Sequence, residues 1–244
     1  MGKYILFIAV IFLTFIVQSI TGFAGTVLAM PFSLMLVGYE TAEPVLNIVG
    51  IVSSALVLFS CFKKVNKREL FKISAVMLIG IAVGFFFKES SFIKPQILYK
   101  ILGASVIFFA VLSAYRFIKN DEPHSHGRAL SAVILTLSGF VHGLFVCGGP
   151  LLVVYAGGKM RDRDEFRATL SAVWIVLNCI ILAEDLSAGN ISVSLLPLIA
   201  AASAVLVFAV IIGNLVYRKI SRRFFLILTY ALMFVSGVSL LIKK

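Results

Sequence analysis

Residues 129–157 read ALSAVILTLSGFVHGLFVCGGPLLVVYAG, an apolar run that Cys147-Gly148-Gly149-Pro150 interrupts. As one continuous helix this run would be about 43 Å long at 1.5 Å per residue, whereas the hydrocarbon core of a bilayer is about 30 Å thick. Glycine and proline break helices at such points. The stretch therefore predicts two shorter helices joined by a break inside a membrane.

The rest of the chain is apolar in the same manner. Residues 4–38 form a second overlong run, which Thr21-Gly22-Phe23-Ala24-Gly25 interrupts. Six further runs have the length of single spans: 44–62, 69–87, 97–117, 168–183, 193–217 and 224–242. The 244 residues are 61% hydrophobic and 14% charged, whereas soluble domains are about 25% charged. Because no soluble fold of this length could bury so much apolar surface, the sequence predicts an all-α polytopic membrane protein.

The formal net charge of +11 comes from Lys and Arg residues that gather in short loops between the apolar runs. This distribution follows the positive-inside rule and argues against nucleic-acid binding. The loops around 116–128 and 159–167 are both basic, so both should be cytoplasmic. They share one side only if 129–157 returns to its side of entry. The same treatment of 4–38 puts the N-terminus outside.

Each half of the chain then holds one broken-helix hairpin and three spans. Since three is odd, the second half is predicted to be inverted relative to the first, as in many secondary carriers. An offset of 124 residues supports this repeat, because it maps Gly25 onto Gly149 and Leu46 onto Leu170. The predicted division is a first repeat at 1–120, a cytoplasmic linker at 121–128 and a second repeat at 129–244.

Three short motifs resemble the sulfite exporter TauE/SafE family (TSUP). They are Gln18-Ser19-Ile20-Thr21-Gly22-Phe23-Ala24-Gly25 with Pro31, then Gly139-Phe140-Val141-His142-Gly143 with Gly148-Gly149-Pro150 and Tyr155, and finally Phe166-Arg167-Ala168-Thr169. The first motif departs from the family's usual three adjacent glycines, because Ala24 sits between Gly22 and Gly25. The resemblance covers essentially the whole chain. It implies a multi-pass transporter of small sulfur-containing anions, such as sulfite or organosulfonates, in the cytoplasmic membrane of a prokaryote. Export is the commoner assignment in the family, and uptake is also assigned.

The two glycine clusters are the first candidate substrate site. Backbone N–H groups at a broken helix point at a ligand, and the helix N-terminus carries about half a positive charge. Glycine allows the backbone to approach an anion closely. Inverted symmetry would bring both clusters together near the midplane, which favours Gly22, Gly25, Gly148 and Gly149 as anion ligands. The alternative is close helix packing, and this is the favoured interpretation of Gly139 and Gly143.

Polar side chains within the apolar runs are the second candidate. The 124-residue offset pairs Gln18 with His142, Asn47 with Ser171, and Ser54 with Asn178. A shared central cavity would need such pairs, but each could equally join two helices by a hydrogen bond. The predicted substrate-binding side chains are Gln18, Ser19, Thr21, Thr26, Asn47, His142, Asn178 and Arg167. For Arg167 two interpretations stay open, an anion attractant at the cytoplasmic mouth or a topological anchor.

His142 has two interpretations as well, a carrier of a proton coupled to transport or a neutral hydrogen-bonding residue between helices. We expect no enzyme activity, because the apolar runs contain no carboxylate pair, no HExxH and no Ser/His/Asp constellation. No cofactor and no metal site are expected. The expected partners are a small anion and the lipid bilayer, with a homodimer left open. An anion channel or an uptake permease of the same fold is the alternative function.

Overall fold

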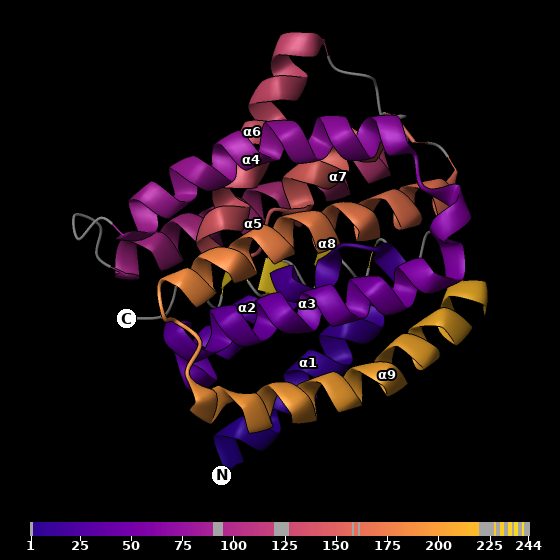
Figure 1. Cartoon of the computed structure of the whole chain (residues 1–244). Coiled ribbons are helices and arrows are strands. Elements are labelled where there is room, and N and C mark those ends of the chain that lie inside the picture. The colour runs from indigo at the N-terminus through magenta and orange to yellow at the C-terminus, as the bar shows by residue number, and fades with distance from the viewer. Residues whose placement is uncertain are drawn as a thin grey trace. The chain divides into compact units, whose positions relative to one another are not determined.

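The computed structural model describes residues 2–89, 95–119, 127–157, 159–160 and 162–219, together with positions 227, 230, 231, 234, 235, 237, 238 and 241. Within these residues the chain is helical, and no strand occurs (Figure 1). The α-helices are α1 (Gly2–Thr21), α2 (Ala24–Val37), α3 (Tyr39–Cys61), α4 (Lys67–Glu89), α5 (Pro95–Ile118), α6 (Arg128–Phe145), α7 (Gly149–Gly157), α8 (Arg163–Ser187) and α9 (Leu196–Lys219). Short 3-10 helices follow α3 at Phe62–Lys64 and precede α9 at Val193–Leu195. The prediction of an all-α fold is confirmed.

Six helical segments of the described chain are long and apolar enough to cross a membrane. They are Gly2–Thr21, Tyr39–Lys64, Lys67–Lys88, Arg128–Phe145, Arg163–Ser187 and Val193–Tyr217. By contrast, α2 has 14 residues and α7 has 9, so at 1.5 Å per residue neither crosses a hydrocarbon core of about 30 Å. The chain is therefore a polytopic membrane protein that also contains two short apolar helices.

The short helices belong to the two expected hairpins. Helix α1 ends at Thr21 and α2 begins at Ala24, so the first break is Gly22 and Phe23. Helix α6 ends at Phe145 and α7 begins at Gly149, so the second break is 146–148. Gly25 and Gly149 therefore lie in the first turns of α2 and α7 rather than in the breaks themselves.

The helix bounds repeat at the offset found in the sequence. Adding 124 to the first residues of α1, α2 and α3 gives 126, 148 and 163, and the corresponding helices α6, α7 and α8 begin at 128, 149 and 163. The inversion of the second half, and the division at 1–120 and 129–244, stay predictions. Most of the predicted linker (121–126) and of the last span (224–242) lies outside the described residues.

The described chain forms two compact units. Unit 1 comprises Met1–Ser74 and Asp162–Lys219, and unit 2 comprises Ala75–Arg161 and Ile220–Lys244. In unit 1, α1 packs on α2 and α9, and α3 packs on α8, α2 and α9 (Figure 1). In unit 2, α7 packs on α6 and α5. Each unit therefore combines segments from both halves of the sequence.

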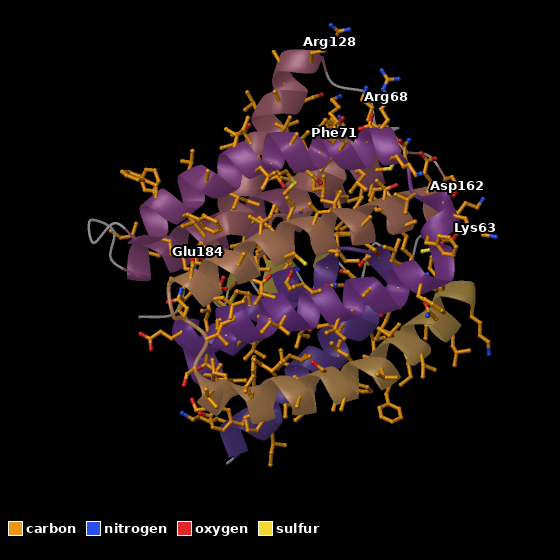
Figure 2. The ribbon with its side chains drawn as sticks, viewed as in Figure 1. Lys63, Arg68, Phe71, Arg128, Asp162 and Glu184 are labelled. Carbon is orange, nitrogen blue, oxygen red and sulfur yellow. The ribbon has the colours of Figure 1, made fainter. Side chains whose placement is uncertain are left out.

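The two ends of the unit 1 helices differ in charge. Figure 2 shows Lys63 and Asp162 near one end of α3 and α8, with Glu184 at the opposite end of α8. Lys63 follows α3, and Arg68 lies in the first turn of α4. Lys63 thus lies at the end of the unit 1 helices opposite Glu184.

Glycines of unit 2 permit close contact between α4 and α6. A Cβ atom on Gly139 would lie 2.0 Å from the Met77 carbonyl oxygen, and one on Gly143 would lie 2.9 Å from that of Ile81. On the facing helix, a Cβ atom on Gly80 would lie 2.0 Å from the Thr136 carbonyl oxygen. Backbone atoms cannot move aside as a side chain can, so these glycines serve helix packing, as expected for Gly139 and Gly143.

Candidate functional site

The first break turns on a left-handed glycine. Gly22 has a φ of +82°, a conformation that residues with a Cβ atom rarely adopt, and its N–H donates to the Gln18 carbonyl oxygen at 2.7 Å. The Thr21 hydroxyl then caps α2, since it accepts from the N–H groups of Phe23 at 3.3 Å and Ala24 at 3.2 Å. It also donates to the Val17 carbonyl oxygen at 2.8 Å. The Phe23 and Ala24 amides next to Gly22 are therefore occupied by Thr21 in this conformation.

Helix α8 lies against this break. A Cβ atom on Gly22 would lie 3.4 Å from the Arg167 Cα atom and 3.5 Å from its Cγ atom. The Gly22 carbonyl oxygen accepts from the Trp174 indole N–H at 2.7 Å. The break is thus held between two residues of α8 that are seven positions, or about two helical turns, apart.

Arg167 is buried, with only 6% of its surface exposed. Its Nη2 atom donates to the Asn214 side-chain oxygen, and its guanidinium lies 4.7 Å from the centroid of the Tyr217 ring. Its Nε atom is buried and has no hydrogen-bond partner. Within the described part of the chain no carboxylate forms an ion pair with this guanidinium. The Arg167 guanidinium is therefore a buried cation with an unsatisfied Nε–H, and the Asp164 carboxylate, three residues earlier on α8, acts on it electrostatically without forming an ion pair.

The start of α8 is fixed by its N-cap. The Asp162 carboxylate accepts from the backbone N–H groups of Asp164 at 2.9 Å and Glu165 at 2.8 Å. These bonds, with that of Glu165 dominant, lower the pKa of Asp162 because they favour the charged carboxylate. The turn between α3 and α4 joins the same end of α8, since Asn66 donates its side-chain amide to the Glu165 carboxylate at 2.8 Å. Both contacts set the position from which Arg167 projects one turn later.

Asn214 and Tyr217 of α9 did not emerge from the sequence as site residues. They are three positions apart, so they share one face of α9. The Tyr217 hydroxyl donates to the Asp164 carboxylate at 2.9 Å, and its ring also lies 4.7 Å from the Arg163 guanidinium. The available signal was that Asn214 is the only amide side chain in the apolar run 193–217.

The other predicted residues of the first motif serve the hairpin itself. A Cβ atom on Gly25 would lie 2.2 Å from the Gln18 side-chain oxygen, so the Gln18 side chain lies over Gly25. Ser19 donates its hydroxyl to the Phe15 carbonyl oxygen at 2.8 Å and packs towards Gly213 of α9, where a Cβ atom would lie 2.5 Å from the Ser19 Cβ atom. Thr26 is buried in the first turn of α2. Gln18 and Thr26 stay predicted ligands, whereas Ser19 already has a packing role against α9.

Asn47 and Asn178 meet in the contact between α3 and α8. The Asn47 amide nitrogen donates to the Asn178 carbonyl oxygen at 3.2 Å, and a Cβ atom on Gly50 would lie 2.8 Å from the Asn178 side-chain nitrogen. This is the helix-joining role that the sequence left open. The Asn47 side-chain oxygen is nevertheless buried without a hydrogen-bond partner, and so is the Ser54 hydroxyl. Buried atoms of this kind call for a ligand or a water molecule.

The second break has the same backbone turn with different partners. Val146 is left-handed, with φ 56° and ψ 28°, and its N–H donates to the His142 carbonyl oxygen at 2.7 Å. The Gly148 N–H points at the His142 Nδ1 atom at 3.4 Å, and its carbonyl oxygen accepts from the Ser138 hydroxyl at 2.7 Å. His142 is 1% exposed. Gly149 follows as the first residue of α7.

Residues 7–240 match the family model described as Sulfite exporter TauE/SafE. The chain belongs to this family. No curated protein and no solved structure matches the chain at a significant level. Membership makes the chain a multi-pass membrane transporter of the sulfite-exporter type, and it agrees with the resemblance that the three motifs carry.

The two units divide the predicted site residues. Unit 1 contains Gln18, Ser19, Thr21, Gly22, Gly25, Thr26, Asn47, Arg167 and Asn178, whereas unit 2 contains His142, Gly148 and Gly149. Unit 1 brings Gly22 and Arg167 into contact, with Asn214 and Tyr217 added. A single site that both glycine clusters form joins residues of two units, and it stays a prediction.

Proposed function

We propose that this TauE/SafE family member is a secondary carrier that exports a small sulfur-containing anion, such as sulfite or an organosulfonate. The observation that carries the proposal is Arg167, a buried cation beside the first helix break that forms no ion pair and whose Nε–H has no hydrogen-bond partner. Taking an isolated charge out of water costs several kcal/mol, so such a residue needs an anion. A transported anion can supply this need for part of each cycle.

The chemistry of the guanidinium fits such a ligand. Its N–H groups form a planar fork that binds two oxygens of one anion at once. Sulfite and sulfonates carry three oxygens on one sulfur atom, so two of them can meet one edge of the fork. Trp174 and Tyr217 add apolar surface near Arg167, which would accommodate the carbon chain of a sulfonate.

The backbone amides at each helix break are the other proposed anion ligands. In the described conformation Thr21 holds the Phe23 and Ala24 amides, and His142 lies at the Gly148 amide. An anion would replace these neutral acceptors, because N–H bonds to a charged oxygen are stronger than those to a hydroxyl or an imidazole. His142 would then be released to take up a proton, which is the proposed coupling to transport.

The alternative is an anion channel or an uptake permease of the same fold. A carrier shows saturable flux that a proton gradient changes, whereas a channel shows fast flux without such coupling. The direction of transport by a carrier follows from the orientation of the proton gradient that accelerates the flux. Neither alternative changes the expected role of Arg167.

The test is flux into proteoliposomes against sulfite, methanesulfonate, thiosulfate and sulfate. Arg167→Gln should lower sulfite flux about 100-fold, since removal of one partner of a buried ion pair costs about 3 kcal/mol or more. Lys219→Gln is the control for charge, because it removes an exposed cation at the end of α9. Equal flux in the two variants would exclude Arg167 from the site. Absence of flux in the wild type for every anion would refute the proposed function.

A further inference from the structure

The guanidinium of Arg167 has one edge that is half occupied. Its Nε–H and one N–H of Nη2 lie side by side and can donate two parallel hydrogen bonds to an oxyanion. Here Nη2 donates to the Asn214 side-chain oxygen, while Nε has no partner. One neutral oxygen therefore stands where an anion would present two charged ones.

We infer that Asn214 is a placeholder ligand, whose amide oxygen occupies the anion subsite of Arg167 until an oxyanion with two adjacent oxygens displaces it. This inference rests on the proposed function and names a residue and a role that the family motifs do not contain. The subsite lies within unit 1, between α8 and α9, beside Gly22.

The neutral amide suits exchange rather than permanent pairing. A hydrogen bond from a cation to a neutral oxygen is weaker than one to a charged oxygen. An incoming anion therefore forms a stronger hydrogen bond with Nη2 than Asn214 does, and it also accepts a hydrogen bond from Nε. When the anion leaves, Asn214 returns, and the guanidinium does not have to stay buried without an acceptor, which would be costly. The amide thus lowers the barrier to release.

Two neighbours keep the guanidinium in position during this exchange. The Tyr217 ring lies 4.7 Å from it, and the Tyr217 hydroxyl is held by Asp164 at 2.9 Å. Asn214 and Tyr217 lie on one face of α9 because they are three residues apart. A shift of α9 relative to α8 would therefore move the placeholder and the stacking ring together, and would open or close the subsite.

Trp174 provides a direct signal for the experiment. It is the only tryptophan in the chain, and its indole N–H donates to the Gly22 carbonyl oxygen beside Arg167. Titration of the purified full-length protein with sulfite and with methanesulfonate, followed by Trp174 fluorescence, gives a Kd for each anion. Flux in proteoliposomes gives the turnover of the same variants.

Two substitutions at one position should have opposite effects on Kd. Asn214→Asp places a tethered carboxylate on both donors, so the Kd for sulfite should rise at least about tenfold. Asn214→Ala removes the competing oxygen, so the Kd should fall about tenfold while turnover falls as well, because release leaves the guanidinium without an acceptor. A merely structural asparagine would not yield tighter binding with slower turnover.

Lys219→Gln is the matched control for charge. It lowers the net charge by one unit on the same helix, as Asn214→Asp does, at an exposed residue near the end of α9. Its Kd should equal that of the wild type. If it weakens binding as much as Asn214→Asp, the effect is long-range electrostatics and the inference is wrong.

The remaining outcomes are also decisive. If Asn214→Asp does not accumulate in the membrane, Asn214→Ala decides alone, and unchanged or weaker binding in it overturns the inference. Wild-type transport of sulfite with both Asn214 variants unchanged would reject the placeholder and leave the proposed function intact. A wild type that neither binds nor transports any of the anions rejects the proposed function, and the inference with it.

Discussion

The two helix breaks share a backbone turn and differ in what surrounds it. Gly22 and Val146 are related by the 124-residue offset, both are left-handed, and both donate their N–H to a carbonyl oxygen four residues earlier at 2.7 Å. The acceptor residues, Gln18 and His142, are related by the same offset. The turn is therefore a property of the repeated hairpin rather than of glycine alone.

The side chains around the turns are not repeated. At the first break a hydroxyl, Thr21, accepts from the Ala24 amide, whereas at the second break an imidazole, His142, lies at the equivalent Gly148 amide. Arg167 contacts the first break, and the residue that corresponds to it in the sequence is Glu43. The comparison teaches that two hairpins with the same backbone turn can carry different side chains, a guanidinium at the first break and an imidazole at the second.

The largest expected effect is loss of folded protein when alanine replaces a glycine next to a break, and its cause should differ between the two breaks. Gly148→Ala puts a Cβ atom 2.5 Å from the Ser138 carbonyl oxygen, which is backbone, so the protein should not accumulate in a folded form. For Gly25→Ala the nearest atoms belong to the Gln18 side chain, with the new Cβ atom 2.2 Å from its oxygen and 2.7 Å from its Cβ atom. The double variant Gln18→Gly with Gly25→Ala should therefore regain its fold. Size-exclusion chromatography of the solubilised protein measures both.

This contrast can also fail in a clear way. Normal accumulation of Gly148→Ala would mean that the second break has room to relax. Failure of Gln18→Gly to rescue Gly25→Ala would mean that more than one side chain encloses the first break. Either result would remove the packing difference between the two turns.

The next effect concerns the proton. A protonated imidazole has no acceptor nitrogen, so His142 can accept from the Gly148 N–H only when it is neutral. His142→Gln, which copies the first break, should keep the fold and flatten the dependence of sulfite flux on pH between about pH 5 and 8. Flux in proteoliposomes at several pH values measures this. A wild-type pH profile in the variant would show that His142 is structural.

A second variant separates the proton from the hydrogen bond. His142→Phe keeps a ring of similar size and has no acceptor, so the Gly148 N–H would be left without its partner. We expect a loss of thermal stability in this variant that His142→Gln does not show. Equal melting temperatures would mean that the 3.4 Å contact contributes little.

A smaller effect tests the cap of α2. Thr21→Val removes the hydroxyl that accepts from Phe23 and Ala24 at nearly constant volume, and loss of such a hydrogen bond costs about 1 kcal/mol. Thr14→Val is the control, since the Thr14 hydroxyl donates to carbonyl oxygens within α1, to that of Val10 at 2.8 Å and to that of Ile11 at 3.3 Å. The melting temperature should fall in Thr21→Val and stay near the wild-type value in Thr14→Val. No difference between the two would mean that the α2 amides have other partners.

The smallest effect tests the shared left-handed turn. A residue with a Cβ atom in this conformation costs about 1–2 kcal/mol, so glycine should be more stable than alanine by about 1 kcal/mol at both positions 22 and 146. The comparisons are wild type with Gly22→Ala, and Val146→Gly with Val146→Ala, each by thermal unfolding. In ordinary helical conformation alanine is the more stable residue. If Val146→Ala were more stable than Val146→Gly, the two turns would not be equivalent.

Much of the architecture could be predicted because a bilayer constrains length so strongly. Every described helix overlaps an apolar run of the sequence, and both overlong runs are broken near their glycine clusters. The breaks at 22–23 and 146–148 lie within two residues of the centres of the clusters at 21–25 and 147–150. Pro150 explains part of this at the second hairpin, because proline is well tolerated in the first turn of a helix and α7 begins just before it.

The candidate site could be predicted only in part. Gly22 and Arg167 were recognised from motifs. Nothing in the sequence indicates that Arg167, near the start of α8, is buried against Gly22 of the first hairpin. Asn214 and Tyr217 were missed because they belong to no recognised motif and lie about 50 residues from Arg167 in the chain. Their role follows only from their contact with Arg167. Ser19 stays a predicted ligand, and the structure adds its packing towards Gly213.

The sequence by itself determined the membrane class, the helix positions, the two breaks and the family. These follow from local quantities, namely the length of apolar runs, the position of glycine and proline, and short motifs. Only the tertiary structure decided that α8 and α9 enclose Arg167, that Thr21 occupies the α2 amides, and that one edge of a guanidinium is half filled by an asparagine. The physical reason is that burial and hydrogen bonding of a polar group depend on residues distant in the chain, whereas hydrophobic length and helix breaking do not.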